Sequence, residues 1–217
     1  MIHDPTSAHD YFHSRFVYDS QRDALWQPVC EYLQPYIPAS GRVLDMGAGY
    51  CSFINQVRAR ERHALDVFPD FARHAAPGVT PHVGSCDDLS RFADGCFDAV
   101  FASNLLEHLT RDSLAATLAE ARRVLKPTGH LILIQPNYRY AYREYFDDYT
   151  HLQVFSHVSL ADQLTASGFD VVRLEPRFLP FSLKSRLPKS PNLVRLYLRL
   201  PLRPLAKQML VVARPAH

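Results

Sequence analysis

Apolar residues follow two different spacings along the chain, and together these spacings predict the fold. Short continuous apolar runs bounded by turn-forming residues are typical of buried strands. Such runs occupy residues 42–46, 64–67, 80–84, 97–103, 130–134, 171–174 and 209–213. Other stretches place apolar residues three or four positions apart, which predicts amphipathic helices. These stretches span residues 7–33, 50–60, 71–76, 113–125 and 159–167.

The predicted strands and helices alternate through most of the chain, and this order is typical of an α/β fold. We predict a doubly wound, mostly parallel, seven-stranded sheet of Rossmann-like type with helices on both faces. Residues 1–40 form an N-terminal helical cap and residues 41–217 form the main domain in this interpretation. The main domain carries two additions, an aromatic loop at residues 138–151 and a basic, proline-rich stretch at residues 176–207. Because ligands of such sheets bind at the carboxyl ends of the central strands, functional residues are expected in the loops that follow them.

A glycine-containing turn follows the first predicted strand. Gly47 and Gly49 stand where this strand ends and a helix is expected to begin. Glycines there let the backbone turn tightly and approach a ligand. Asp66 stands at the end of the second predicted strand, where a carboxylate can hold two ribose hydroxyls. Two ligand classes fit this arrangement, a dinucleotide and S-adenosylmethionine.

The charge beside the turn favours S-adenosylmethionine. Asp45 precedes Gly47 by two residues, and its carboxylate would repel the pyrophosphate of a dinucleotide. The same carboxylate would attract the cationic ammonium and sulfonium groups of S-adenosylmethionine. Ser52 also occupies the last position of the G-x-G-x-x-G dinucleotide pattern. A dehydrogenase is therefore disfavoured, and the competing structural explanation is that Asp45 only caps the following helix.

The order of several motifs resembles that of class I S-adenosylmethionine-dependent methyltransferases, in the group often called type 11. The resemblance covers residues 42–169 and the last strand near Met209. The segments that carry it are VLDMGAGYCSF, ALDVFPD, VGSCDDL, FDAVFASNLLEHL, RVLKPTGHLILIQPN and HLQVFSHVSLADQLTASGFDVV. The resemblance is specific for the fold and the cofactor, and it does not identify the methyl acceptor.

The resemblance implies roles for residues of four loops at one edge of the sheet. Asp45 and the glycine backbone would hold the methionine end of the cofactor, Asp66 would bind its ribose, and the Cys86 amide would meet its adenine. Asn104 and Leu105 would pass beneath the methionine portion. The full set of implied cofactor-binding residues is Asp45, Met46, Gly47, Ala48, Gly49, Asp66, Val67, Ser85, Cys86, Asp87, Asn104 and Leu105.

The chain departs from the family pattern at two positions. Cys51 stands where the family often has a third glycine, and Ser85 stands where it often has aspartate. The adenine amino group would then be met by Ser85 or by Asp87. Both changes fall at the rim of the implied pocket, so we expect cofactor binding to persist.

Two histidines are candidate catalytic bases, because a hydroxyl acceptor must lose its proton during methyl transfer. His108 follows the fourth predicted strand in a Glu107-His108 pair, and His151 ends the aromatic loop. Histidine titrates near neutral pH, which suits this task. The alternative is that both are packed, hydrogen-bonded side chains. Together with Glu107 they also have the chemistry of a zinc or magnesium site, but we expect no resident metal.

Each addition to the domain has two interpretations. The tyrosines and Phe146 of the aromatic loop stack on an acceptor or cover the site, or they pack against the protein. The leucines and arginines of residues 191–207 contact a membrane surface or a lipid-linked substrate, or the leucines pack and the arginines lie in water. We expect the packed arrangement for the basic stretch.

Bulk properties narrow the function further. The 217 residues carry a formal net charge of only +2, which argues against a nucleic acid partner. The four cysteines have no metal-binding spacing, and the N-terminus has no signal-peptide pattern, so we expect reduced thiols and a cytoplasmic location. No apolar stretch approaches the length of a membrane span, although peripheral membrane contact stays open.

The predicted function is an S-adenosylmethionine-dependent methyltransferase with a small-molecule or glycan acceptor in a biosynthetic pathway. The alternatives are an RNA methyltransferase and a non-catalytic protein that binds S-adenosylmethionine as a partner. The residues leave open which acceptor atom is methylated and the oligomeric state.

Overall fold

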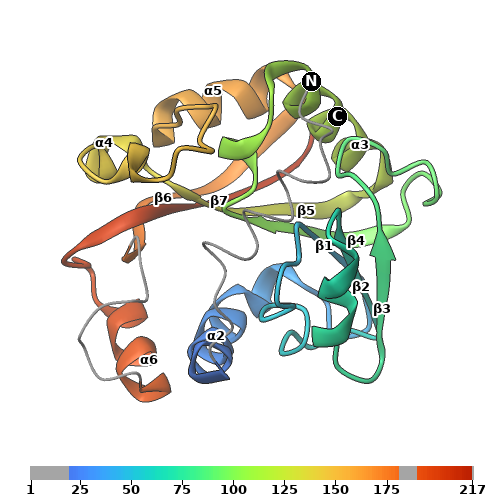
Figure 1. The fold of residues 1–217 in the computed structure, drawn as a ribbon, viewed down its shortest axis with the longest axis horizontal. Helices are drawn as coiled ribbons and strands as arrows, with labels where there is room; N and C mark the ends of the chain where they lie inside the picture. Colours follow the sequence, from blue (N-terminus) through green and yellow to red (C-terminus); the bar gives the residue numbers. More distant parts are fainter. Residues whose placement is uncertain (1–19, 181–189, 217) are drawn as a thin grey trace.

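A computed structural model describes residues 20–180 and 190–216, and its centre is a seven-stranded sheet (Figure 1). The strand order is β3-β2-β1-β4-β5-β7-β6. Strands β1 to β5 pair in parallel, and β7 runs antiparallel to both of its neighbours. The strands are β1 (Arg42–Met46), β2 (Glu61–Asp66), β3 (Val79–Val83), β4 (Phe97–Ser103), β5 (Leu125–Pro136), β6 (Phe169–Pro180) and β7 (Ala206–Pro215). The predicted fold class is confirmed.

Helices lie on both sides of this sheet. In Figure 1, α3, α4 and α5 lie above the sheet, and α2 and α6 lie below it. The α-helices are α2 (Ser20–Leu33), α3 (Arg111–Val124), α4 (Tyr138–Ala141), α5 (His157–Ala166) and α6 (Pro191–Arg199). Single 3-10 turns are η1 (Gln34–Tyr36), η2 (Pro69–His74), η3 (Leu106–His108) and η4 (Tyr145–Asp147). No helix of the described residues is long and apolar enough to cross a membrane.

Local sequence signals explain where α3 and α5 begin and end. The Thr110 side chain accepts a hydrogen bond from the Ser113 N–H at the start of α3. Ser156 and Ser159 form a reciprocal capping box at the start of α5. Gly168 follows α5 with φ +81°, a conformation that glycine adopts without strain, as expected for the residue after a helix.

The predicted helix at residues 50–60 is wrong, because this segment consists of turns. Cys51 has φ +57°, outside the right-handed helical region, so a helix cannot start there. Two helix-like hydrogen bonds follow, from Asn55 N to Cys51 O and from Val57 N to Phe53 O. The apolar side chains still point inward, and Phe53 stacks on Phe101 of β4 at 3.7 Å between ring centroids. The spacing therefore predicted the burial correctly and the backbone incorrectly.

Other predicted elements differ mainly in their type or bounds. The helix expected at residues 71–76 is the 3-10 helix η2, which ends before Pro77. Only residues 20–33 of the N-terminal helix fall within the described residues, where they form α2. The aromatic loop contains α4 and η4, and the basic stretch contains the end of β6 and α6.

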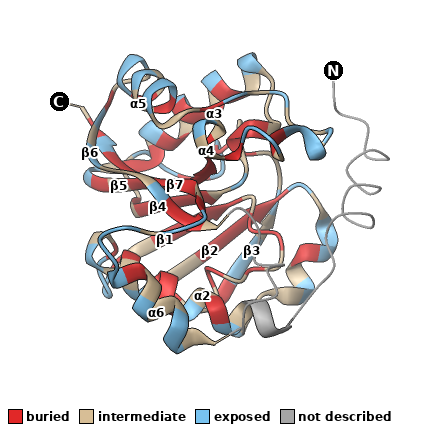
Figure 2. Ribbon diagram, turned by 90° about the vertical axis from the view of Figure 1, so that its left-hand side faces the viewer, coloured by how far each residue is buried: buried red, intermediate tan, exposed pale blue. Residues whose placement is uncertain are grey.

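Two buried layers hold the helices to the sheet, and Figure 2 shows them as buried segments along the strands. One layer joins α3 and α5 to the sheet through residues such as Leu118, Leu160 and Leu131. The other joins α2 and the turns after β1 to the opposite face through residues such as Leu33, Phe53 and Phe101. Burial of these apolar side chains is the main stabilising contribution to the fold.

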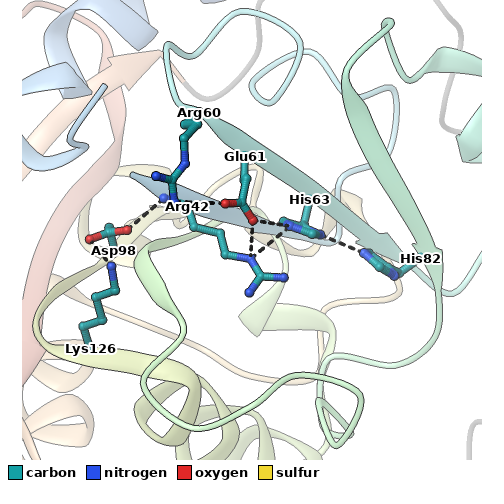
Figure 3. A network of polar contacts seen from close by, with 7 residues as sticks. All are labelled: Arg42, Arg60, Glu61, His63, His82, Asp98 and Lys126. Atoms are coloured by element: carbon teal, nitrogen blue, oxygen red, sulfur yellow. Dashed lines mark hydrogen bonds and ion pairs between the residues drawn. The ribbon is translucent and has the colours of Figure 1, made fainter. Parts of the chain in front are cut away.

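A polar network crosses the first three strands near Arg42 (Figure 3). Arg42 Nε donates to His63 Nε2 at 3.1 Å and forms an ion pair with Glu61 at 3.2 Å. His63 Nδ1 lies 3.0 Å from His82 Nε2. Because Nε2 accepts from Arg42, the assigned tautomer of His63 carries its proton on Nδ1 and donates it to His82. Burial, with the nearby charge of Arg42, lowers the pKa of His63 to about 4.

This network predicts a loss of stability in mild acid. Unfolded His63 binds a proton as the pH falls below its ordinary pKa of 6.5, whereas the folded residue stays neutral down to about 4. The free energy of unfolding should therefore fall between these two pH values, by up to about 3 kcal/mol from this residue. Urea unfolding at several pH values should show a shallower decrease for His63→Gln than for the wild type. Above pH 7 the two pH dependences should coincide, and equal slopes below pH 6 would contradict the assignment.

Candidate active site

The glycine turn after β1 has a backbone that requires glycine. Gly47 has φ +69° and Gly49 has φ +52°, in the left-handed region that other residues enter at a cost. The N–H groups of Gly47 and Ala48 donate to the carbonyl of Leu65 in β2, at 2.8 and 3.0 Å. A Cβ atom at Gly47 would lie 3.0 Å from Leu105 Cδ1. The turn is thus fastened to β2 on one side and packed against Leu105 on the other, while Met46, which ends β1, is buried.

Asp66 lies beside this turn, at the carboxyl end of β2. Its Oδ2 accepts the Gly49 N–H at 2.9 Å and its Oδ1 accepts the Phe68 N–H at 3.0 Å. The residue is 8% exposed, and burial raises the pKa of its carboxyl. Val67, the next residue, is exposed. The structure therefore brings the predicted acid next to the predicted glycine backbone.

Asp45 is more deeply placed than its neighbour Asp66. It is 3% exposed, and the backbone N–H of Ile54 donates to its carboxyl. Burial and the charge of Asp66 raise its pKa well above the ordinary value. This contact joins Asp45 to the segment after the glycines, which is not the helix that the capping alternative assumed. The repulsion between the two nearby carboxyls disfavours a negative charge on both of them at once.

The two departures from the family pattern have different structural consequences. Cys51 carries the left-handed backbone that a third glycine would supply, and its side chain is buried. In the loop after β3, Ser85 is half-buried and Cys86 is buried, with its Sγ 3.4 Å from Thr117 Oγ1. Asp87 accepts a hydrogen bond from Ser113 Oγ at 2.6 Å, which turns it toward the start of α3.

The turn after β4 places Asn104 and Leu105 near the glycine turn. Asn104 is exposed and has φ +50°. Its Oδ1 accepts a hydrogen bond from Gln208 Nε2 of β7 at 2.7 Å, and its Nδ2 donates to Ser103 Oγ at 3.2 Å. The sequence analysis did not identify Gln208, because β7 is far from β4 in the chain. Gln208 reaches this edge of the sheet only through the antiparallel pairing of β7 with β5.

The two candidate histidines come together. The ring centroids of His108 and His151 lie 4.9 Å apart with the planes at 63°. His108 is partly exposed, and burial together with His151 lowers its pKa to about 4. Tyr145, which is fully buried, lies against His151 with ring centroids 4.6 Å apart. The sequence predicted both histidines as candidates, and the structure places them in one cluster at the end of β4.

The tautomer of His108 follows from its neighbours. Thr150 Oγ1 donates its proton to Asp148 Oδ1 at 2.6 Å, and hydrogen bonding by Thr150 lowers the pKa of this acid, which keeps it ionised. The Thr150 hydroxyl can therefore only accept from His108 Nδ1, which lies 2.9 Å away. The assigned tautomer has its proton on Nδ1 and a lone pair on Nε2. That Nε2 lies 4.0 Å from Glu107 Oε1.

Glu107 is the least expected group in this cluster. Its side chain is fully buried, and neither carboxyl oxygen has a hydrogen-bond partner among the described residues. Burial raises the pKa of Glu107 to about 8. Its backbone carbonyl accepts from Leu152 N at 2.7 Å and from Gln153 N at 3.0 Å, which ties the loop of His151 to the turn after β4. Adjacency of Glu107 to His108 was visible in the sequence, but this isolation was not.

Comparison with known proteins decides the family. A family model described as a methyltransferase domain matches residues 18–174. The chain belongs to this methyltransferase family. Its fold is the class I, Rossmann-like fold of S-adenosylmethionine-dependent methyltransferases.

This methyltransferase is 25% identical over 146 residues to the phosphoethanolamine N-methyltransferase of Plasmodium falciparum. That match covers 60% of the chain and 54% of the Plasmodium protein, so the chain spans about half the length of this curated relative.

Solved structures resemble the whole fold. One is an S-adenosylmethionine-dependent methyltransferase from Archaeoglobus fulgidus, with a TM-score of 0.68, 19% identity and coverage of 96% of this chain and 99% of that one. Another is a putative methyltransferase in complex with the Trm112 activator of Haloferax volcanii, with a TM-score of 0.67, 17% identity and coverage of 93% of this chain and 100% of that one. A third is the 1,6-didemethyltoxoflavin-N1-methyltransferase of Burkholderia thailandensis with S-adenosylhomocysteine bound. Its TM-score is 0.63 at 18% identity, and the match covers 98% of this chain and 87% of that one.

The aromatic loop of the methyltransferase divides between packing and exposure. Tyr145 packs in the interior and its hydroxyl donates to the Gln153 carbonyl at 2.7 Å. Tyr142, Phe146 and Tyr149 are exposed. Part of the loop thus packs against His151 in the interior, and three aromatic residues are exposed at the surface.

The expectation for the basic stretch is wrong for most of its leucines. Leu198 is buried, but five others are exposed: Leu193, Leu196, Leu200, Leu202 and Leu205. The cations have partners on other elements instead, since Arg195 pairs with Glu31, Arg203 with Glu175 and Lys207 with Glu144. Helix α6 is only nine residues long and turns its Leu198 side toward the core, so the leucines on its other sides have no surface to cover.

The glycine turn gives a test of the pocket. Gly47→Ala should lose about 1–2 kcal/mol of stability from its left-handed backbone. Its added methyl group should also displace Leu105 and weaken S-adenosylmethionine binding. Gly95→Ala is the matched control, because Gly95 has φ +59° and open space around its Cβ position. Calorimetric titration should show normal cofactor affinity for Gly95→Ala and a loss for Gly47→Ala; equal affinities would place the cofactor elsewhere.

Proposed function

We propose that this methyltransferase modifies a small-molecule or glycan acceptor in a biosynthetic pathway. The cofactor would lie over the glycine turn, and the acceptor would lie next to His108 and His151. The observation that carries the proposal is the left-handed turn of Gly47 and Gly49 with the Asp66 carboxylate beside it. This arrangement puts a tight glycine turn beside an acid that would bind the ribose, at one edge of the sheet.

The residues present fit S-adenosylmethionine. Asp66 has two oxygens at the end of β2, the number that a pair of ribose hydroxyls requires. Asp45 and Asp66 are buried close enough for the charge of one to raise the pKa of the other. A cationic ligand near them would relieve this repulsion, whereas a pyrophosphate would increase it. When bound, S-adenosylmethionine supplies a methyl group on a good leaving group.

The remaining implied residues would border the cofactor. Leu105 packs over Gly47 and would form one wall, and Asn104, held by Gln208, would form the lip beside it. Cys86 and Ser85 would border the adenine. Asp87 is held by Ser113, which favours Ser85 over Asp87 for the adenine amino group.

At the acceptor side, the protein must align a nucleophile and remove its proton. The lone pair on His108 Nε2 would accept this proton, because Thr150 and Asp148 hold the ring in that tautomer. His151 lies against it and is the second candidate. The exposed rings of Tyr142, Phe146 and Tyr149 would contact a flat or sugar-like acceptor.

Two observations support an acceptor of this class over RNA. The net charge of +2 gives little attraction for a polyanion. The named relatives from Plasmodium and Burkholderia act, by their names, on phosphoethanolamine and on a toxoflavin precursor, which are small molecules. Both resemblances are distant, so they support the class of acceptor and not its identity.

Asp66→Ala should weaken S-adenosylmethionine binding by about tenfold to a hundredfold, because hydrogen bonds to a charged group are lost. Asp70→Ala is the control, since Asp70 is an exposed acid that pairs only with Arg73 among the contacts observed in η2. Titration calorimetry with S-adenosylmethionine and S-adenosylhomocysteine measures both. Unchanged affinity in Asp66→Ala, with the fold intact by circular dichroism, would remove this acid from the pocket.

His108→Ala should retain cofactor affinity and lose methyl transfer by about 10²–10⁴-fold. Release of S-adenosylhomocysteine in a panel of small hydroxyl, amine and sugar acceptors provides the assay. His130→Ala is the control, because His130 bonds to the Tyr36 carbonyl near the start of β5. Transfer to RNA alone, and to no member of the panel, would refute the proposed acceptor class.

A further inference from the structure

We infer that Glu107, His108 and His151 form a binding site for a divalent transition-metal ion. The three side chains come from the turn after β4 and from the end of the aromatic loop. One ligand atom from each residue lies within 4.8 Å of the others. The inference goes beyond the proposed function, because methyl transfer by a histidine base needs no ion.

The first observation is the Glu107 carboxyl. It is fully buried, and both of its oxygens lack a hydrogen-bond partner among residues 20–180 and 190–216. Buried carboxylates in folded proteins are normally paired, hydrogen-bonded or bound to a metal. Elsewhere in this chain the rule holds: Asp66 receives two backbone N–H groups and Glu175 pairs with two arginines. A cation between Glu107 and the histidines would supply the missing partner.

The second observation is the orientation of His108. The Thr150 hydroxyl accepts a hydrogen bond from His108 Nδ1 and donates one to Asp148. The lone pair of His108 Nε2 is then on the side of Glu107. Metal-binding histidines typically donate their other ring N–H to a carboxylate, a carbonyl or a bridging group in this way. The Thr150 carbonyl, 3.3 Å from the same Nδ1, reinforces the arrangement.

The third ligand, His151, is held by the loop that carries it. The Glu107 carbonyl accepts from Leu152 N and Gln153 N, directly after His151 in the chain. The buried Tyr145 ring supports the imidazole from one side. Bond lengths near 2.1 Å in a tetrahedral site place ligand atoms about 3.4 Å apart. Side-chain rotations that move the ligand atoms by roughly an ångström would bring them from their present separations to that distance.

The ligand set selects the kind of ion. Two imidazoles and one carboxylate suit zinc and its neighbours among the transition metals better than magnesium or calcium, which prefer oxygen. Three protein ligands leave a coordination position for an oxygen atom. If the proposed methyl transfer is correct, that position would receive the acceptor, and the two histidines would act as ligands instead of bases. Metal binding itself does not depend on that step.

The test uses untagged full-length protein stripped with a chelator and titrated with Co²⁺, whose visible spectrum reports nitrogen and oxygen ligation, followed by Zn²⁺ competition. The wild type should bind one ion per chain. Glu107→Gln and His151→Asn should each weaken binding at least about a hundredfold, and Thr150→Val should weaken it about tenfold or more. The matched controls Glu144→Gln and His130→Asn, which change a carboxylate and an imidazole away from the cluster, should bind as the wild type does.

Folding and cofactor binding are measured in the same variants. Zn²⁺ should raise the thermal midpoint of the wild type and leave that of Glu107→Gln unchanged, while the metal-free Glu107→Gln should be at least as stable as the metal-free wild type. Equal Co²⁺ affinity in the wild type and Glu107→Gln would overturn the inference. If S-adenosylmethionine binds normally in all variants and no ion binds, the metal site fails and the proposed function stands. If S-adenosylmethionine fails to bind the wild type, the proposed function fails on its own.

Discussion

The active end of this methyltransferase depends on how the glycine turn is tied to β2. The Leu65 carbonyl accepts the N–H groups of Gly47 and Ala48, and the Asp66 carboxylate accepts that of Gly49. These bonds place the turn over the end of the sheet, where Leu105 closes against the bare face of Gly47. They also bring the Asp66 carboxyl to the same edge as the turn after β4. The glycine turn, the Asp66 carboxyl and the Leu105 side chain are therefore held together at one edge of the sheet.

The buried acids at the ends of β1 and β2 differ from the buried acid after β4 in their hydrogen-bond partners. Asp66 accepts two backbone N–H groups and Asp45 accepts the N–H of Ile54, although burial still raises the pKa of both acids. Neither oxygen of the Glu107 carboxyl makes a hydrogen bond to another described residue. Among residues 20–180 and 190–216, Glu107 is the buried acid whose carboxyl oxygens lack a partner, and it lies beside two imidazoles. A ligand that the polypeptide itself does not supply would explain this arrangement. The contrast within one edge gives the metal inference more weight than Glu107 would have alone.

The strands were predictable because short apolar runs between glycines, prolines and polar residues record burial on both faces of a parallel sheet. β1 and β4 match their predicted bounds. The segment after the glycine turn was not predictable in the same way. Apolar spacing records which side chains point inward, and it does so correctly for Phe53 and Ile54, but nothing in it shows that Cys51 adopts a left-handed backbone. The exposed leucines of α6 were not predicted, because the sequence does not show that the short α6 turns only its Leu198 side toward the core.

The site was predictable only as far as its residues are adjacent in the chain or belong to strand ends. Gly47, Asp66 and Asn104 were predicted as site residues because each ends or follows a strand. Contacts between residues far apart in the chain, such as that of Thr150 with His108, were not predicted, because no local sequence pattern encodes the conformation of the loop that carries Thr150.

Polar burial in the described part of the chain is concentrated at this one edge. Apart from His63 and Thr117, the buried polar residues lie at or next to the ends of β1, β2, β4 and β5 or at the start of the antiparallel β7: Asp45, Asp66, Glu107, Gln135, Asn137 and Gln208. Burying polar groups opposes folding unless they are satisfied, so a fold selected for stability alone would place apolar residues there. His63, in the first half of β2, is hydrogen-bonded to Arg42 and His82. The unsatisfied carboxyl and amide, Glu107 and Gln135, both lie at the carboxyl ends of neighbouring strands. The stability that these buried polar groups cost is therefore expected of a region that binds ligands.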